Sequence, residues 1–339
     1  VHTKVDIIHR RTKVAQQTLN IQEENMTEDG IRDWLRGPMV AVATPFTEDF
    51  ELDLDALQSN IRFMIDGGVR NGQGTLLVGG AGGEHPALNI SERKDVMSAS
   101  VEAANGEAPV LTSIQHTDPR LTLELAQHAR KAGVHGAQLG PTYYYEPTEE
   151  DAYRLFEYIA SKSDVILMIY HTWWDGLSMS RGLIERLARF DTVQAVKWST
   201  PDDGHYRDVM TNLSDDLVFI DNSGQQILSH IYGARGFITH LSGFWPQYPA
   251  ELWRRLESRD YAGVKDHLAA FKWKWVKWRS KVSQLTGGEG PFIKAAMETV
   301  GLQVGPPRPP SVRPTKELLE ELGRLFRECG VPYVDGGDR

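Results

Sequence analysis

The segment Val193-Gln-Ala-Val-Lys-Trp-Ser-Thr200 is a short apolar run with a lysine near its end. Read as a β-strand, the run alternates sides, so Lys197 shares a face with the small apolar residues Val193 and Ala195. An amine that is shielded from water loses its proton more readily, and the neutral amine can attack a ketone to form an imine. The run therefore predicts a buried strand that carries a reactive lysine.

Similar β-rich runs recur along the chain and alternate with amphipathic stretches of helix length. We expect eight strands, at residues 39–43, 75–78, 110–113, 136–139, 165–170, 193–198, 217–221 and 236–239. The helical patterns between them include residues 54–65, 91–104, 121–132, 149–161, 181–188 and 225–232. Eight strand–helix units in series predict an α/β chain folded as a (β/α)8 barrel, or TIM barrel.

Glycine-containing signatures close several of these helices, as in Asp66-Gly-Gly-Val69, Lys131-Ala-Gly-Val-His-Gly136 and Tyr232-Gly-Ala-Arg-Gly236. They place glycine at the helix C-cap, where a positive φ is needed. A doubly wound dinucleotide-binding sheet is the alternative fold. The stretch Gly79-Gly-Ala-Gly-Gly83 contains G-x-G-G but does not complete G-x-G-x-x-G with a suitable acidic residue downstream, so we prefer the barrel.

The composition limits the classes of partner. The length of 339 residues and the hydrophobic content of 40% suit one large barrel or two ordinary domains. The formal net charge of −9 argues against a nucleic-acid partner. The most basic stretch, residues 272–281, is short and indicates an amphipathic helix. The lone Cys329 fits a reducing compartment, and no apolar run is long enough to cross a membrane. We therefore expect a cytoplasmic protein with no membrane partner.

The chain divides into three parts. Residues 1–25 are polar and precede Met26, so we expect an extension that is disordered or vector-derived. A transit peptide is the alternative, and the acidic Glu23 and Glu24 argue against it. Residues 26–258 are predicted to form the barrel with a lead-in helix. Residues 259–339 are predicted to be a helical region packed on the barrel, interrupted by the extended spacer Gly305-Pro-Pro-Arg-Pro-Pro310.

Residues at the ends of barrel strands meet at one rim even when they are far apart in the sequence. Along the fifth strand Ile166, Met168 and Tyr170 share a face, which puts the Tyr170 phenol beside Lys197 on the next strand. A phenol next to an amine can move protons during imine formation. The rim is therefore the predicted active site.

Five motifs in this order resemble the dihydrodipicolinate synthase / N-acetylneuraminate lyase family of class I aldolases. They are Val40-Ala-Val-Ala-Thr-Pro-Phe46, Gly80-Ala-Gly-Gly-Glu84, Pro141-Thr-Tyr-Tyr144, Met168-Ile-Tyr170 and Val196-Lys-Trp-Ser199. The resemblance covers about residues 37–329. It implies a barrel with a helical C-terminal extension, commonly a homotetramer, that forms a Schiff base with pyruvate or another 2-oxo acid. No H-x-H pair or His/Glu spacing indicates a metal site, so we expect neither a metal nor a cofactor.

The resemblance assigns roles to individual residues. Lys197 falls on the Schiff-base position, Tyr170 on the tyrosine that relays protons, and Tyr144 on a second tyrosine that reaches a neighbouring subunit's site. The loop from Gly80 to Glu84 falls on the one that holds the substrate carboxylate through backbone N–H groups. The residues expected to bind substrate are Thr44, Gly80, Ala81, Gly82, Gly83, Glu84, His85, Tyr143, His171, Trp173, Ser199 and Ile238.

The chain departs from the family pattern at two places. Ala81 and Gly82 stand where family members carry hydroxyl residues, which breaks the threonine–tyrosine proton relay. After the fifth strand the chain reads Tyr170-His-Thr-Trp-Trp-Asp175, where synthases carry an arginine for the second substrate's carboxylate. We therefore do not expect the lysine-pathway reaction with aspartate semialdehyde.

Several alternatives stay open at this point. Glu84 acts either in catalysis or as an anchor for its own loop, and Trp173 and Trp174 either line a pocket or cover the barrel mouth. One or two of the histidines that follow strands would replace the hydroxyl relay; these are His85, His116, His171 and His240. A dehydratase or hydratase of 2-keto-3-deoxy sugar acids would use the same imine. A barrel without catalysis that serves as a binding protein is the alternative from another class.

Overall fold

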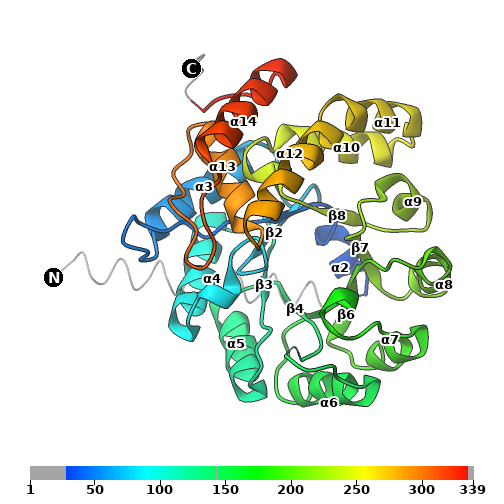
Figure 1. Cartoon of the computed structure of the whole chain (residues 1–339). Coiled ribbons are helices and arrows are strands. Elements are labelled where there is room, and N and C mark those ends of the chain that lie inside the picture. Colours follow the sequence, from blue (N-terminus) through cyan, green and yellow to red (C-terminus); the bar gives the residue numbers. More distant parts are fainter. Residues whose placement is uncertain (1–27, 143, 335–339) are drawn as a thin grey trace, which may run out of the picture.

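The structure is a computed structural model that describes residues 28–142 and 144–334. Within these residues, eight parallel strands form a closed barrel in chain order, and the last strand pairs with the first (Figure 1). The strands are β1 (Gly37–Ala41), β2 (Thr75–Val78), β3 (Val110–Ser113), β4 (Gly136–Leu139), β5 (Leu167–Tyr170), β6 (Val193–Trp198), β7 (Val218–Asp221) and β8 (Gly236–Thr239). The predicted (β/α)8 fold is confirmed. The predicted extension at residues 1–25 lies outside the described residues.

Helices follow the strands around the outside of the barrel. They are α3 (Leu54–Asp66), α4 (Ile90–Ala104), α5 (Pro119–Ala132), α6 (Glu149–Ala160), α7 (Arg181–Leu187), α8 (Asp203–Leu213), α9 (Gln226–Ile231) and α10 (Gln247–Glu257). Three short 3-10 turns are η1 (His85–Ala87), η2 (Trp173–Asp175) and η3 (Leu241–Gly243). Before the barrel comes α2 (Glu28–Trp34), whose Ile31 and Trp34 pack with the interior residue Met39 and so close the amino-terminal mouth.

Local sequence explains where these helices begin and end. Asn89 starts α4 with a capping box in which its side chain accepts from the N–H of Glu92 and the Glu92 side chain accepts in return. Gly133 ends α5 with the predicted positive φ of 86°. The same prediction is shifted by one residue at α3, because Gly67 caps the helix with φ −80° and Gly68 takes the positive φ of 114°.

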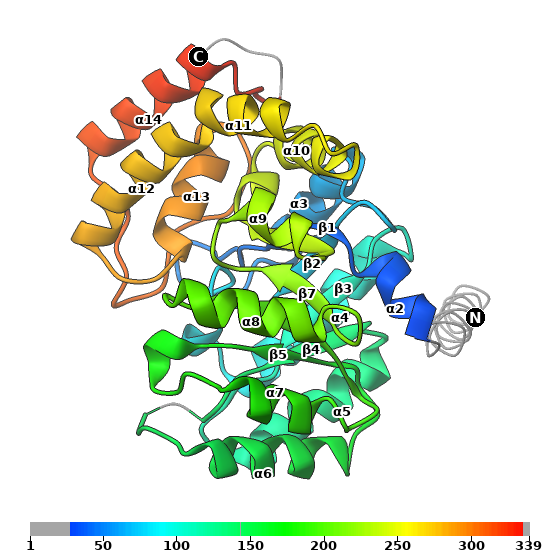
Figure 2. The same ribbon diagram turned by 90° about the vertical axis from the view of Figure 1, so that its right-hand side faces the viewer.

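The C-terminal region adds α11 (Tyr261–Ala270), α12 (Lys272–Leu285), α13 (Gly290–Thr299) and α14 (Lys316–Cys329). Figure 2 shows these helices gathered beside α10, on the opposite side of the barrel from α6. The basic stretch at 272–281 is helical, as predicted, and buries Trp275 and Trp278. Among the described residues, no helix combines the length and the apolar character that crossing a membrane would need.

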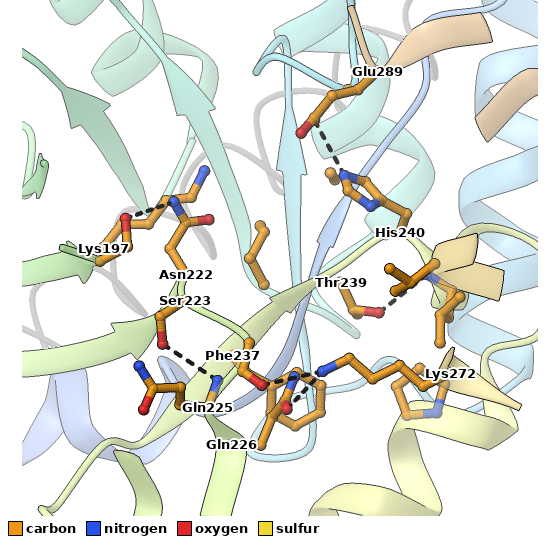
Figure 3. Close-up of a pocket in the computed structure, with 18 of the residues that line it drawn as sticks. Lys197, Asn222, Ser223, Gln225, Gln226, Phe237, Thr239, His240, Lys272 and Glu289 are labelled. Atoms are coloured by element: carbon orange, nitrogen blue, oxygen red, sulfur yellow. Dashed lines mark hydrogen bonds and ion pairs between the residues drawn. The ribbon is translucent and has the colours of Figure 1, made fainter. Parts of the chain in front are cut away.

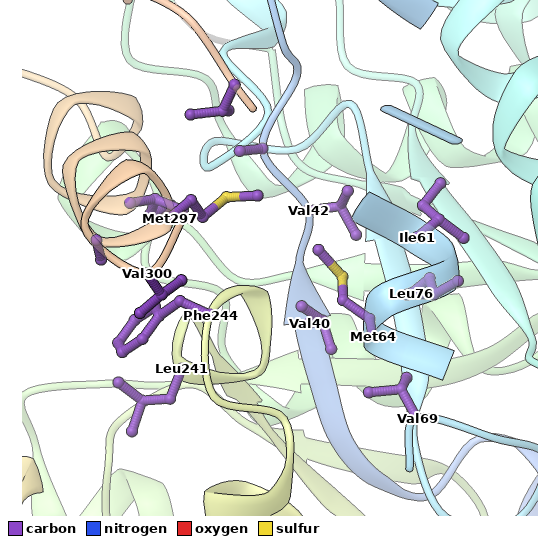
Figure 4. Packing of buried hydrophobic residues seen from close by; sticks show 14 of the residues in the cluster. Val40, Val42, Ile61, Met64, Val69, Leu76, Leu241, Phe244, Met297 and Val300 are labelled. Atoms are coloured by element: carbon purple, nitrogen blue, oxygen red, sulfur yellow. The ribbon is translucent and has the colours of Figure 1, made fainter. Parts of the chain in front are cut away.

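One apolar cluster joins the barrel to the C-terminal helices (Figure 4). In this cluster Val40 of β1 and Met64 of α3 belong to the same buried group as Met297 of α13 and Phe326 of α14. Burying such side chains contributes about 1.5–3 kcal/mol each. The helical region therefore shares the core of the barrel, which holds its inner surface in a fixed position over the carboxyl ends of the strands.

Candidate active site

Lys197 lies at the end of β6, where its Cα pairs in register with that of Tyr170 on β5. The residue is 5% exposed, and its Nζ stands 4.0 Å from the centroid of the Tyr170 ring. Among the described residues, neither a hydrogen bond nor an ion pair reaches this Nζ. Burial lowers the pKa of Lys197 to about 8, although the Glu289 carboxylate acts in the opposite direction. A useful fraction of the amine, on the order of a tenth, is then neutral at pH 7.

Tyr170 provides a protonated phenol beside that amine. Burial raises the pKa of Tyr170, and the charges of Glu289 and Asp175 raise it further. The edge of its ring packs against Trp174 at a centroid distance of 5.9 Å. At neutral pH this hydroxyl is therefore a proton donor, as the sequence suggested for a shuttle beside an imine.

The glycine loop after β2 faces the same space. Ala81 and Gly82 line the cavity, and their backbone N–H groups have no backbone partner among the described residues. A side chain at position 82 would have its Cβ 3.0 Å from both the Ala41 Cβ and the Ile293 Cδ1. Close packing, together with the need for free N–H groups, explains a glycine here. It also means that the missing hydroxyl cannot be restored at this position without moving its neighbours.

Two predicted residues support the loop from behind. The Thr44 hydroxyl donates to the carbonyl oxygen of Gly83 at 2.7 Å. Glu84 is buried and forms an ion pair from Oε1 to Lys294 Nζ at 2.8 Å, and its Oε2 accepts from the N–H of Arg308 at 3.2 Å. These contacts favour the anchoring alternative for Glu84, because its carboxylate is held by the C-terminal region and does not line the cavity.

His171 does not join the predicted site. It follows Tyr170 and so faces the helix layer, where it packs against Trp198 at a ring distance of 4.6 Å. Its Nε2 accepts from the N–H of Met179 at 3.0 Å, which leaves Nδ1 to donate to the carbonyl of Ser199 at 2.6 Å. Burial lowers the pKa of His171 to about 4, so the ring is neutral and ties loops together. His171 was predicted to bind substrate, but in this position it does not line the cavity, because alternate residues of a strand face opposite sides.

The remaining predicted residues fall into three groups. Trp173, Ser199 and Ile238 line the cavity, and so does Trp174. Tyr144 is 93% exposed and does not line the cavity, and Tyr143 lies outside the described residues. His85 is neutral, because burial and then the charge of Arg93 lower its pKa to about 4.

The cavity has a volume of about 560 Å³ and a second wall, of which the sequence had indicated His240 but neither Lys272 nor Glu289. Figure 3 shows this wall across from Lys197, with His240 after β8, Lys272 on α12 and Glu289 at the start of α13. His240 Nε2 and Glu289 Oε2 form an ion pair at 3.1 Å. Lys272 Nζ donates to Gln226 Oε1 at 2.7 Å and to the carbonyl of Gly224 at 3.3 Å.

One sequence signal could have found part of this wall. Lys272, Trp275, Val276 and Arg279 all line the cavity and follow the i, i+3, i+4, i+7 spacing of one helix face. That face mixes aromatic and basic residues, which the sequence alone does not distinguish from a solvated surface. The sequence around Glu289 has no comparable spacing.

Comparison with known proteins decides the family. The model of the Dihydrodipicolinate synthetase family matches residues 34–328. The chain belongs to this family. An uncharacterized DapA-like lyase of Thermococcus onnurineus is 28% identical over 301 residues, which are 87% of this chain and 99% of that protein. The 4-hydroxy-tetrahydrodipicolinate synthase of Exiguobacterium sibiricum is 28% identical over 294 residues, which are 85% of this chain and 97% of that protein.

The solved dihydrodipicolinate synthase of Aquifex aeolicus superposes with a TM-score of 0.77 at 25% identity, covering 88% of this chain and 99% of that one. Of the residues at which the sequence predicted a departure from the family pattern, Ala81 and Gly82 line the cavity, whereas Asp175 lies in η2 and does not line it.

Proposed function

We propose that the protein is a class I lyase that forms a Schiff base between Lys197 and pyruvate or another 2-oxo acid, and makes or breaks a C–C bond next to it. The observation that carries the proposal is the state of the Lys197 amine. It is buried, has a lowered pKa and is unpaired among the described residues, and it lies against a protonated phenol. Burying an amine without a partner reduces the stability of the fold, and such a loss is expected at a position where the amine has to react.

Imine formation follows from this arrangement. The neutral Nζ attacks the ketone carbon, one proton of the amine and the proton of Tyr170 go to the oxygen, and the oxygen leaves as water. The product is a positively charged imine beside a phenolate. In the cleavage direction that phenolate accepts the proton of the substrate hydroxyl while the electrons of the breaking C–C bond enter the imine, which gives an enamine and an aldehyde.

The glycine loop supplies the site for the 2-oxo acid's carboxylate. The N–H groups of Ala81 and Gly82 face the cavity without a backbone partner among the described residues, and successive N–H groups in a turn form an anion-binding concavity. With the carboxylate held there, the ketone carbon is directed towards Lys197.

The second substrate has to suit the remaining walls. The segment after β5 offers Trp173 and Trp174 in place of an arginine, which argues against copying the reaction of the lysine-pathway synthases. Arg279 and Lys272 supply cations from α12, so an anionic aldehyde remains compatible with the cavity. Product analysis separates an aldolase from a dehydratase that uses the same imine.

We also propose a homo-oligomer. The exposed Tyr144 and Tyr145 present two aromatic rings to solvent beside the strand-end rim, at 93% and 65% exposure. Exposed aromatic side chains in close succession are typical of contact surfaces. Sedimentation at micromolar protein concentration tests this, and a monomer would contradict it.

The test of the catalytic proposal is intact-mass analysis after incubation with pyruvate and borohydride. We expect a reduced adduct of pyruvate-imine mass on the wild type and on Lys265→Ala, which removes an exposed lysine of α11. Lys197→Ala is expected to form none. A wild type that forms no adduct with pyruvate or with longer 2-oxo acids would reject the lyase proposal and favour a binding protein.

A further inference from the structure

The wall formed by His240 and Glu289 has no role in the mechanism above. Both side chains line the cavity that contains Lys197, and they are linked to each other at 3.1 Å. The His240 side chain is 11% exposed and that of Glu289 is 38% exposed, so the pair is open to the cavity without being a surface pair. Figure 3 shows the pair on the opposite side of this space from β6.

The position of Glu289 is fixed by contacts with the glycine loop. It immediately precedes α13, whose first residue, Gly290, lies so close to Glu84 that an added Cβ would be 2.5 Å from the Glu84 carboxyl group. One turn later in α13, Lys294 forms its ion pair with the same Glu84. The glycine loop, which we assign to the substrate carboxylate, is therefore joined through α13 to Glu289.

Side chains from several elements around the cavity act on the Glu289 carboxyl group. Burial by itself raises the pKa of Glu289, but His240, Lys197 and Arg279 outweigh it and keep the carboxylate ionised. The same carboxylate acts on Tyr170 from across the cavity. An ionised carboxylate within the field of Lys197 stabilises a positively charged imine there.

The missing hydroxyl relay leaves one proton transfer without a group to perform it. Conversion of a pyruvate imine to the enamine removes a proton from C3, the carbon next to the imine carbon. With the carboxylate on the glycine loop and Nζ on the imine carbon, C3 points to the rest of the cavity, because the three substituents of a planar carbon lie about 120° apart. Tyr170 gives its proton to the departing ketone oxygen and then accepts the proton of the substrate hydroxyl, and Ala81 and Gly82 carry no acid or base.

We propose that the His240–Glu289 pair is the acid–base group for C3 of the substrate imine. In the condensation direction the C3–H electrons form the C2–C3 double bond, the imine nitrogen takes up the C=N π electrons and becomes neutral, and the proton goes to the ionised carboxylate of Glu289, which His240 Nε2 contacts at 3.1 Å. In the cleavage direction the pair returns that proton to C3 of the enamine. The inference rests on the proposed Schiff base on Lys197 and names the group that acts on it.

Exchange of the pyruvate methyl protons tests the pair without knowledge of the second substrate. Pyruvate in D2O is followed by NMR with the wild type, Glu289→Gln and His240→Asn, and each variant is also trapped with borohydride. We expect both variants to keep the adduct on Lys197 and to exchange the C3 protons at least about 100-fold more slowly. Glu298→Gln, the same substitution further along α13, is the matched control and is expected to exchange at the wild-type rate.

Three outcomes would overturn the inference. Exchange at the wild-type rate in Glu289→Gln and in His240→Asn would exclude the pair as the C3 base. Loss of the adduct together with exchange, in folded variants with unchanged melting curves, would assign the pair to activation of Lys197 instead. A wild type that forms the adduct but never exchanges C3 would show that no base acts on this carbon. A wild type without adduct is a different result, because it rejects the proposed function itself.

Discussion

The barrel rim and the C-terminal helices each bury a lysine, and the two amines differ in whether they have a hydrogen-bond or ion-pair partner. Lys197 is 5% exposed and Lys294 is 1% exposed. Each Nζ lies 4.0 Å from an aromatic centroid, of Tyr170 and of Phe46 respectively, and burial lowers the pKa of each to about 8. Lys294, however, pairs with Glu84 at 2.8 Å and donates to the carbonyl of Pro306 at 2.9 Å, whereas Lys197 has no such partner among the described residues.

The difference separates a structural amine from a reactive one. Lys294 joins the glycine loop to α13, and its charge is neutralised where it lies. Lys197 is buried without a hydrogen bond or an ion pair among the described residues, which leaves its lone pair available. A lowered pKa alone does not distinguish the two lysines, but the presence or absence of a partner does.

The largest effect on folding is expected from breaking the structural pair. Lys294→Met leaves the Glu84 carboxylate buried without its cation, so we expect the free energy of unfolding to fall by about 3–5 kcal/mol. Urea denaturation measures this. The double variant Lys294→Met/Glu84→Gln should recover part of the loss, and an unchanged midpoint in the single variant would mean that the pair does not hold α13.

The next largest effect is expected at the Tyr170 phenol beside the reactive lysine. Tyr170→Phe keeps the ring beside Lys197 but removes the proton donor, and we expect the rate of adduct formation to fall by about 100-fold or more. Tyr158→Phe, on the outer helix α6, should leave the rate unchanged. Equal rates in Tyr170→Phe and the wild type would exclude the phenol from imine formation.

A smaller effect of opposite sign is expected when the reactive lysine is removed. The fold lowers the pKa of Lys197 from 10.5 to about 8, so between these values the unfolded chain binds more protons and stability rises with pH. At pH 7 the full cost of burying the charge is present. Lys197→Met should therefore raise the free energy of unfolding by about 1–3 kcal/mol, with the gain vanishing above about pH 10.5. A destabilised variant would show that the amine has a hidden structural partner.

The pH dependence of adduct formation follows from the same pKa. Below pH about 8 the neutral fraction of Lys197 rises about tenfold per pH unit, and the rate of trapping by borohydride at saturating pyruvate should rise with it and then level off. Stopped reactions between pH 6 and 10 measure the profile. A rate that keeps rising to pH 10 would place the pKa of Lys197 near that of a hydrated lysine.

The sequence contained most of the information about the barrel. Alternation within short runs identified all eight strands, and the register of Tyr170 with Lys197 followed from their places at the ends of adjacent strands. The lysine and its tyrosine were predictable because strand position fixes both depth and direction.

The C-terminal wall was not predictable in the same way. Which face of α12 meets the cavity depends on how Trp275 and Trp278 pack into the common core, and that packing is a property of the assembled chain. Glu289 belongs to a glycine-rich turn whose place is set by contact with Glu84, more than two hundred residues earlier in the sequence. The periodic face of α12 does not show what it packs against, and the turn that carries Glu289 has no periodic pattern. The sequence likewise suggested two uses for Glu84, and the Lys294 contact favours one of them.

A peptide map of the protein after reduction with borohydride in the presence of pyruvate tests most directly whether Lys197 is the reactive amine. We expect the added mass on the peptide that contains Lys197 and none on those that contain Lys272 or Lys294, although burial lowers the pKa of all three to about 8. An adduct on Lys272 or Lys294, or no adduct on any of them, would contradict the claim that the unpaired lysine is the reactive one.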